Sequence, residues 1–217
     1  GTIAYDASGN SNHGTLVNNP SWVDGKMGGA LDFDGSNDYV DCGSGVSLNV
    51  PNTMTVEMWI KVNQFSDTFA RLYANRSSNT YPFTVGIYGT SSPKIAFADV
   101  NNVDSLLSLM TLTTNTWYHI AVVSTGAQAT AKIYLNGIDD TGSISSNGFA
   151  FSSITNIGSY NGSMHYFDGQ IDDVRIYNRA LSPEEIQDLY NYEYSSKYAI
   201  WQNPVTKNIS LKSLESE

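Results

Sequence analysis

The stretch DGQIDDVRIYNRALSPEEIQDLY, residues 168–190, predicts a strand, a turn and a short helix in succession. Residues 171–177 alternate between two faces, as a strand requires, so that Asp172, Val174 and Ile176 are expected to share one face. The turn follows at residues 178–181. This order of elements predicts that the chain ends its folded part with a strand and a capped helix.

The start of the helix carries several independent signals. Ser182 suits the N-cap, Pro183 suits the first helical position, and Glu185 completes a capping box with Ser182. Leu181 and Ile186 are spaced as a hydrophobic staple across the cap. Local chemistry alone therefore predicts a helix that begins near residue 182.

The rest of the chain has the rhythm of short strands separated by turns. The clearest is 53–62, in which every second residue is apolar. Asn136-Gly137 is a strong tight-turn signal. Strands every 8 to 12 residues with turns between them favour an antiparallel sandwich or jelly roll. The other expected strands are 30–33 and 39–41 (a hairpin around DGSND), 83–88 and 94–98 (a hairpin around GTSSP), 105–113, 117–124, 130–135, 148–153 and 156–159.

A family resemblance rests on motifs that follow one another along the chain. They are DASGNSNHGTL (6–16), ALDFDGSNDYV (30–40), TVEMWIKV (55–62), TWYHIAVV (116–123), KIYLNG (132–137) and IDDVRIYNRALSPEEI (171–186). In this order they resemble the LamG-like members of the concanavalin A-like lectin/glucanase group. The resemblance implies an all-β, two-sheet antiparallel jelly-roll sandwich with one short C-terminal capped helix. It covers a domain at residues 1–190, and leaves 191–217 as a C-terminal extension, either a linker or tail against the sandwich or an added strand.

Composition limits the classes of partner and of cellular location. The chain has 217 residues, 21 acidic against 11 basic side chains and a formal charge of −10, which disfavours nucleic acid and anionic membranes. The single cysteine, Cys42, excludes an internal disulfide, and no stretch approaches the roughly 20 apolar residues of a membrane-spanning helix. The chain begins with Gly-Thr, and we expect a module of a larger extracellular, secreted or cell-surface protein.

The resemblance implies a structural calcium ion that joins an N-terminal loop to the last strand. Calcium prefers six to eight oxygen ligands, which three separate parts of this chain offer. Related β-glucanases place an aspartate directly before a VRVY-like run, and the matching position here is Asp172 or Asp173. The predicted metal residues are Asp6, Asn10, Asn12, His13, Asp34, Gly35, Ser36 and Asp172.

Signals for catalysis are weak. Glycoside hydrolysis usually uses two carboxylates that flank the scissile bond. The glucanases of this group carry them as E-x-D-x-x-E, a motif that this sequence lacks. Glu57, on the same face of its strand as Trp59, is interpreted as a paired structural carboxylate, and His119 as a structural histidine. We therefore expect no catalytic residues and no enzyme.

Binding of a polysaccharide or glycoconjugate is the expectation that the resemblance implies. Sugars present apolar C–H faces that suit aromatic rings, and hydroxyls that suit Asn, Asp and Arg side chains. The candidate carbohydrate-binding residues lie in or beside predicted loops, and are Tyr73, Arg76, Tyr81, Tyr160, Asn161, His165 and Tyr166.

Three functions are consistent with these observations. The first is a non-catalytic carbohydrate-binding or adhesive module, stabilised by calcium, that also contacts other domains of its parent protein. The second is a protein–protein or architectural module without a glycan site. The third is a glycoside hydrolase or polysaccharide lyase with an unrecognised site. A sugar-sized site of tyrosine with Asn or Arg would favour the first, and a cleft with two carboxylates would favour the third.

Overall fold

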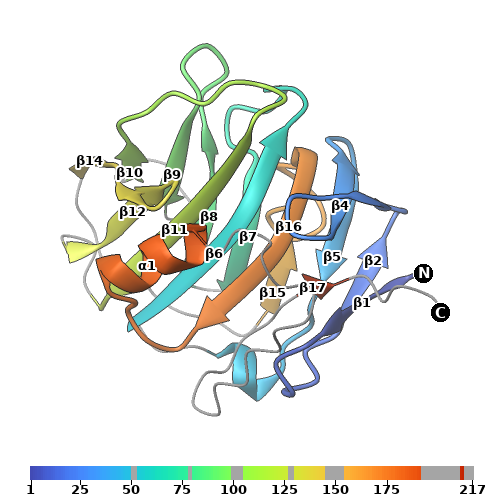
Figure 1. Ribbon diagram of the computed structural model, residues 1–217. Helices are drawn as coiled ribbons and strands as arrows, with labels where there is room; N and C mark the ends of the chain where they lie inside the picture. The colour runs from blue at the N-terminus through green and yellow to red at the C-terminus, as the bar shows by residue number, and fades with distance from the viewer. Residues whose placement is uncertain are drawn as a thin grey trace.

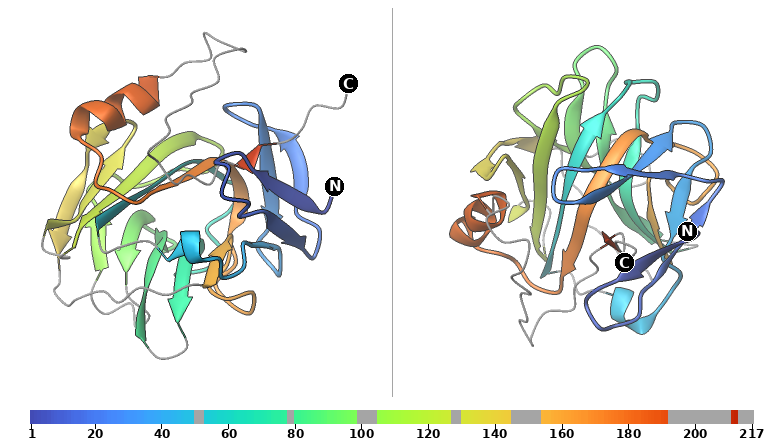
Figure 2. Two further views of the ribbon diagram at one scale, coloured as in Figure 1. Left: turned by 90° about the horizontal axis from the view of Figure 1, so that it is seen from below. Right: turned by 45° about the vertical axis from the view of Figure 1, so that its right-hand side comes forward.

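The protein folds as two antiparallel sheets packed face to face. The structure is a computed structural model, and it describes residues 1–49, 53–77, 80–98, 105–126, 130–144, 154–191 and 211–212. In Figure 2 (left) the sheets form two layers, with helix α1 (Pro183–Asn191) on the outside of one of them. The prediction of an all-β two-sheet sandwich with one short C-terminal capped helix is confirmed.

Non-consecutive strands are neighbours in both sheets, as in a jelly roll (Figure 1). The larger sheet contains, in order, β14 (Thr141–Ile144), β10 (Ser105–Ser108), β9 (Lys94–Ala98), β8 (Thr80–Tyr88), β7 (Arg71–Ser77), β15 (Ile154–Ile157), β5 (Tyr39–Asp41), β2 (Gly14–Val17), β1 (Ile3–Asp6) and β17 (Leu211–Lys212). The smaller sheet contains, in order, β13 (Ile138–Asp139), β12 (Lys132–Leu135), β11 (Trp117–Thr125), β6 (Thr53–Val62), β16 (Asp168–Tyr177), β4 (Gly29–Asp34) and β3 (Ser21–Asp24). A 3₁₀ turn, Val46–Leu48, follows β5.

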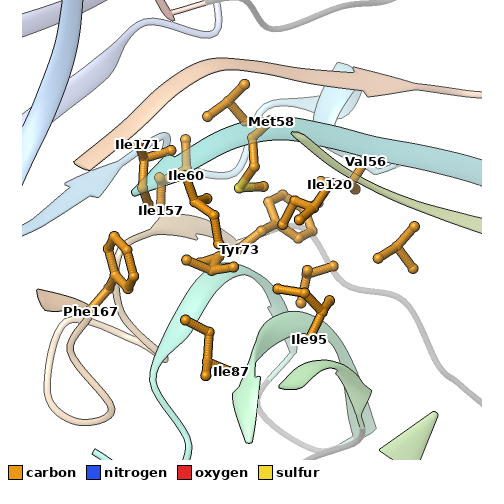
Figure 3. Close-up of a cluster of buried hydrophobic side chains, with 14 of the residues drawn as sticks. Val56, Met58, Ile60, Tyr73, Ile87, Ile95, Ile120, Ile157, Phe167 and Ile171 are labelled. Carbon is orange, nitrogen blue, oxygen red and sulfur yellow. The ribbon is translucent and has the colours of Figure 1, made fainter. Parts of the chain in front are cut away.

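The main core lies between the two sheets and is organised around β6 (Figure 3). The predicted inner face of β6 is confirmed, because Met54, Val56, Met58, Ile60 and Val62 are all at most 1% exposed. They pack against side chains of the larger sheet, among them Tyr73, Phe83, Ile87, Ile95 and Phe97. Burial of this much apolar surface is the main term that stabilises the sandwich.

One strand departs from simple alternation, and this overturns the predicted face of Asp172. Between Asp172 and Arg175, β16 advances three residues while its partner β6 advances two, which is a β-bulge. Asp173, inside the bulge, has φ 48°, in the left-handed region. Asp172 consequently pairs with Trp59 on the outer face, opposite the core that receives Val174 and Ile176.

The connection around DGSND is not a hairpin, contrary to the sequence-based prediction. β4 belongs to the smaller sheet and β5 to the larger one, so the turn carries the chain from one sheet to the other. The sequence of a tight turn does not state whether the next strand pairs with the previous one. The predicted 83–88/94–98 hairpin is confirmed by the pairing of β8 with β9, whereas the expected strand 105–113 ends at Ser108.

The helix start is confirmed in detail. The Glu185 backbone N–H donates to Ser182 Oγ (3.2 Å), and the Ser182 N–H donates to Glu185 Oε2 (2.9 Å), which is the reciprocal capping box. Leu181 and Ile186 are both buried, in a second core cluster on the outer face of the smaller sheet with Tyr134 and Tyr177. The smaller sheet is therefore covered on both faces at this point.

Parts of the sequence-based interpretation fall on the C-terminal extension. Residues 211–212 form β17, which pairs with β1 through Tyr5–Lys212 and Asp6–Leu211. The rest of 192–217, and the expected strand 148–153, lie outside the described residues.

Cys42 is buried beneath the sheet, and this burial raises the pKa of its thiol to about 12, with smaller contributions from Asp41 and Asp6.

Candidate functional site

The strongest candidate site is a row of four aromatic rings contributed by two loops and the end of a strand. Tyr88 ends β8, Phe69 lies in the β6–β7 loop, and His165 and Tyr160 lie in the β15–β16 loop. Neighbouring ring centroids are 5.3 Å apart for Tyr88–Phe69, 5.7 Å for Phe69–His165 and 6.2 Å for His165–Tyr160. None of the four is fully buried, and Tyr88 is 38% exposed. We call these four residues and Asp67 the aromatic patch.

Asp67 and the backbone hold the patch in place. The Asp67 carboxylate contacts His165 Nδ1 (3.2 Å) and accepts the Phe69 backbone N–H (2.7 Å). His165 has φ 57°, a conformation uncommon for non-glycine residues, and its carbonyl accepts the Arg71 N–H (2.9 Å). The β15–β16 loop is therefore held by the side chain of His165 through Asp67 and by its carbonyl through Arg71. The His165 ring contacts both Phe69 and Asp67.

The structure brings two of the predicted carbohydrate-binding residues, Tyr160 and His165, into this patch. Two others shape the same loop, since Tyr166 Oη donates to the Gly162 carbonyl (2.8 Å) and Asn161 Oδ1 accepts a hydrogen bond from Ser163. Tyr73 is a correction. It is fully buried in the main core, where the edge of its ring meets Phe83, and it cannot contact a sugar.

Arg76 and Tyr81 lie on β7 and β8, and their side chains fall outside what the structure describes. The sequence-based reasoning missed Asp67 and Phe69, and it placed Tyr88 beside a predicted loop without including it among the candidates. The only signal for them was the presence of aromatic and acidic residues beside turns, which many positions of this chain share. Their proximity depends on the sheet order, which juxtaposes the β6–β7 and β15–β16 loops.

The first group of predicted metal residues forms a self-contained loop after β1. The Asp6 carboxylate accepts the Ser8 N–H (2.8 Å), the Ser8 hydroxyl (2.8 Å) and the Asn12 N–H (2.9 Å). His13 Nδ1 accepts the Asp6 N–H (3.0 Å), and Asn10 donates to Ser8 Oγ. Both Asp6 oxygens are thus used to order the loop.

The second group lies in the turn between β4 and β5. Asp34 Oδ1 accepts the Ser36 N–H (2.8 Å), which fixes the turn, and Gly35 has φ 71°. A Cβ at Gly35 would stand 2.7 Å from Cβ of Asp168, so the start of β16 approaches this turn closely. Burial raises the pKa of Asp168, and the charges of Asp32 and Asp34 add to the effect.

The third group is Asp172, on the outer face of β16. It is 4% exposed, and its Oδ2 accepts the Met27 N–H at 2.7 Å. Burial raises its pKa to about 6, opposed by the Met27 hydrogen bond and increased by the charge of Asp173. An ionised Asp172 carboxylate has no ion-pair partner within the described residues. A bound cation would lower the free-energy cost of burying this charge.

The three groups do not share a contact. Among the described residues, no hydrogen bond or ion pair links Asp6, Asp34 and Asp172, and no three His, Cys, Asp or Glu side chains come together as metal ligands do. Of the three aspartates, Asp172 is the most deeply buried, at 4% exposed. One ion held by all three groups stays a prediction.

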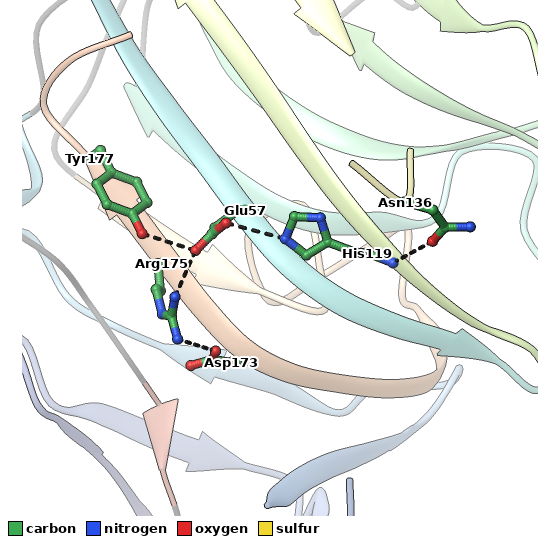
Figure 4. Close-up of polar contacts among 6 residues, drawn as sticks. All are labelled: Glu57, His119, Asn136, Asp173, Arg175 and Tyr177. Atoms are coloured by element: carbon green, nitrogen blue, oxygen red, sulfur yellow. Dashed lines mark hydrogen bonds and ion pairs between the residues drawn. The ribbon is translucent and has the colours of Figure 1, made fainter. Parts of the chain in front are cut away.

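Glu57 is the centre of a buried polar network on the outer face of the smaller sheet (Figure 4). It is 2% exposed and accepts hydrogen bonds from Tyr177 Oη (2.9 Å), Arg175 Nη1 (3.1 Å) and His119 Nε2 (3.2 Å). Burial alone would raise the pKa of Glu57, but His119 and Arg175 outweigh it and hold the pKa below its usual range. Arg175 also pairs with Asp173 in the bulge. The expected pairing of Glu57 within the sandwich is present, with His119 as one of its partners.

A shallow hollow of about 440 Å³ lies between α1 and the β12–β13 turn. It is lined by Tyr134, Gly137, Asp139, Pro183, Glu184, Gln187 and Asp188. Tyr134, its aromatic residue, is only 5% exposed and therefore presents little ring surface for stacking. The hollow is a weaker candidate for sugar binding than the aromatic patch.

Sequence comparison identifies the family. A sequence model of the concanavalin A-like lectin/glucanases superfamily, of laminin G type, matches residues 34–187, and the chain belongs to this superfamily. No curated protein sequence matches the chain. The resemblance noted in the motifs is therefore confirmed by a match that spans both sheets.

Solved structures share the fold at low identity. Domain 4 of AbnA, a GH43 extracellular arabinanase from Geobacillus stearothermophilus, in complex with arabinotriose, is 21% identical, with a TM-score of 0.59 and 87% of each chain covered. The binding domain of Paraclostridial Mosquitocidal Protein 1 is 17% identical, with a TM-score of 0.66, covering 89% of this chain and 52% of that one. Trypanosoma rangeli sialidase is 14% identical, with a TM-score of 0.59, covering 82% and 29%. The chain thus spans about half of the toxin domain and under a third of the sialidase.

Proposed function

We propose that this protein is a non-catalytic carbohydrate-binding module that works as part of a larger extracellular protein. The observation that carries the proposal is the aromatic patch. Its rings offer apolar faces to the C–H groups of a sugar, and Asp67 offers an acceptor for a sugar hydroxyl beside them. This combination of ring surface with a few polar groups is typical of small-ligand sites.

The structural neighbours support a binding function without establishing it. The domain of the Geobacillus arabinanase was solved with arabinotriose, and the mosquitocidal protein domain is a binding domain. Both share the present fold. Within the described residues of this chain, no helix is long and apolar enough to span a membrane.

The absence of catalysis is part of the proposal. Glu57, the one glutamate within the described strands of the smaller sheet, has both carboxylate oxygens bonded and lies beneath neighbouring side chains. A hydrolase needs a carboxyl group that can reach the glycosidic oxygen or the anomeric carbon. Purified protein incubated with β-glucans, xylan, arabinan and chitin should release no reducing ends.

The binding proposal is tested by isothermal titration with soluble oligosaccharides, first with the wild type and then with Tyr88→Ala and His165→Ala. Stacking of an aromatic side chain on a nucleic-acid base is worth roughly 1–3 kcal/mol, and stacking on a sugar should not exceed that value. Each variant should therefore lose about 5- to 150-fold in affinity for the oligosaccharide. Tyr5→Ala is the matched control, because Tyr5 is 45% exposed and meets His13 edge-on outside the patch. Equal loss in the control, or none in the patch variants, contradicts the assignment.

We also propose a structural calcium ion at Asp172. The support is the buried carboxylate with its raised pKa, and the turn 24–28 that folds against it so closely that a Cβ on Gly25 would stand 2.4 Å from Asp172 Oδ2. Carbonyl oxygens of such a turn are suitable calcium ligands. Titration calorimetry of EDTA-treated wild type and Asp172→Asn with calcium tests this, since only the wild type should bind.

A protein–protein module is the second candidate function. Three apolar side chains are exposed, namely Leu109 (62%), Met110 (45%) and Ile138 (67%). The Leu109 N–H donates to the Asp140 carbonyl, so the segment that contains Leu109 and Met110 lies beside the segment that contains Ile138. Exposed apolar groups of this kind often mark contacts with other proteins. If the wild type binds no sugar while Ile138→Asp abolishes association with the neighbouring domain of the parent protein, this function is favoured.

A further inference from the structure

The angles between the rings of the aromatic patch restrict the physical form of the ligand. Neighbouring rings are inclined by 56° (Tyr88–Phe69), 80° (Phe69–His165) and 69° (His165–Tyr160). Rings that bind the flat surface of a crystalline polysaccharide must be coplanar, because each has to meet the same plane of sugars. A row of mutually tilted rings instead presents separate faces, which suits one glycan chain or its end.

The charge of the patch restricts the ligand's chemistry. The Asp67 side chain is 31% exposed and the His165 side chain 26%, so a ligand on the rings meets this carboxylate. Arg71, whose guanidinium carbon lies 6.0 Å from the Phe69 ring centre, is 1% exposed and donates Nη1 to the Phe69 carbonyl (2.7 Å), so it lies beneath the ligand surface. A sugar hydroxyl can donate a charge-assisted hydrogen bond to Asp67, whereas a uronate, sialate or sulfate group is repelled.

The net charge of the chain acts in the same direction. At −10 the protein repels a polyanionic glycan before contact, and salt weakens that repulsion. We propose that the patch selects single chains of neutral glycans, with Asp67 as the residue that determines specificity against anionic ones. This inference rests on the proposed carbohydrate-binding function and adds the class of glycan and the residue that selects it.

The test compares three classes of polysaccharide with the full chain. Affinity electrophoresis measures binding to soluble neutral chains (arabinan, xyloglucan, galactomannan) and to soluble anionic chains (polygalacturonate, hyaluronan), and sedimentation measures binding to microcrystalline cellulose and chitin. The wild type should bind at least one neutral chain, and neither the anionic nor the crystalline class. Raising the salt concentration should narrow the difference between neutral and anionic chains.

The Asp67→Asn variant tests the role of the carboxylate. It keeps the size of the side chain and an acceptor for the Phe69 N–H, and should lose about tenfold in affinity for the neutral chain while discriminating less against anionic ones. Asp41→Asn, at an exposed position whose Oδ1 accepts the Gly43 N–H (2.8 Å) as Asp67 accepts that of Phe69, changes the net charge equally and should leave the ratio unchanged. Circular dichroism of both variants confirms folding.

The outcomes separate the two proposals. Binding of no polysaccharide refutes the proposed function together with this inference. Binding of a crystalline or an anionic polysaccharide, or an unchanged ratio in Asp67→Asn, refutes the inference and leaves the binding function standing. Equal changes in Asp67→Asn and Asp41→Asn would attribute selectivity to the net charge and remove Asp67 from its assigned role.

Discussion

Replacing Glu57 with glutamine should destabilise the protein by about 3 kcal/mol. Removing one partner of a buried ion pair costs roughly 3–5 kcal/mol. The lower end applies here because the Arg175 side chain is 20% exposed and keeps its contact with Asp173. The glutamine oxygen can still accept from one or two neighbours, but its amide group must then face His119, Arg175 or Tyr177, all of which donate to Glu57 now.

The measurement is urea-induced unfolding followed by tryptophan fluorescence. The control is Lys132→Gln, which breaks an ion pair with Asp139 whose two side chains are 47% and 45% exposed, and which should cost less than about 1 kcal/mol. A loss below about 1 kcal/mol in Glu57→Gln, similar to the control, would refute the view that this network stabilises the fold.

The pH dependence supplies an independent check. The pKa of Glu57 is lower in the folded state than in the unfolded state, so the unfolded state binds the proton more readily. The stability that Glu57 contributes is therefore present above its unfolded pKa of about 4.3 and is lost as the pH falls through the lower folded value. The difference between wild type and Glu57→Gln should shrink progressively as the pH falls below this range, and a difference that grows instead would contradict the assigned sign.

The remaining predictions concern the metal, the cap and a crowded glycine. At free calcium about 1,000 times its dissociation constant, binding at Asp172 adds roughly 4 kcal/mol to the free energy of unfolding. EDTA should therefore lower the melting temperature by about 8 to 16 °C, and calcium but not magnesium should restore it. Equal melting temperatures in EDTA and in calcium would exclude the ion. In calcium-free buffer the folded-state pKa of about 6 exceeds the unfolded value of about 3.9, so the contribution of Asp172 to stability should fall by about 3 kcal/mol between about pH 4 and 6, and Asp172→Asn should remove this contribution in denaturation curves. Ser182→Ala should cost about 1 kcal/mol through the lost cap, and Glu185→Ala a similar amount if the box acts reciprocally; no change in thermal melting would contradict the capping geometry. Gly158→Ala should cost about 1–3 kcal/mol, because the residue has φ 84° and its Cβ would stand 2.6 Å from the Phe33 ring; unchanged stability would mean that the ring moves freely.

Local features of the fold were predictable from the sequence. The capping box at Ser182 and the Asn136-Gly137 turn, with φ 52° and 77°, depend on residues within four positions of one another, and the structure has both. The inner face of β6 was predictable because every second residue from Met54 to Val62 is apolar. Each of these rests on chemistry that is complete within one segment.

Features that depend on strand pairing were not predictable in the same way. The bulge at Asp173 reverses the face of Asp172, and only the register with β6 reveals it. The aromatic patch was half found, because His165 and Tyr160 share one loop, while Phe69 and Tyr88 come from elsewhere in the chain. Tyr73 was misassigned because a tyrosine near a turn has the same local sequence whether its ring faces the core or the solvent.

The position of β6 has a consequence for hydrogen exchange. This strand is hydrogen-bonded to β11 on one side and β16 on the other, with the main core beneath it and the Glu57 network above it. Successive amides of β6 point to β11 and β16 in turn, and both of these strands pack on the main core. We therefore expect the amides to exchange with deuterium only when the whole domain unfolds. The slowest amides of residues 55–60 would then report the global free energy of unfolding directly, in native buffer and without denaturant.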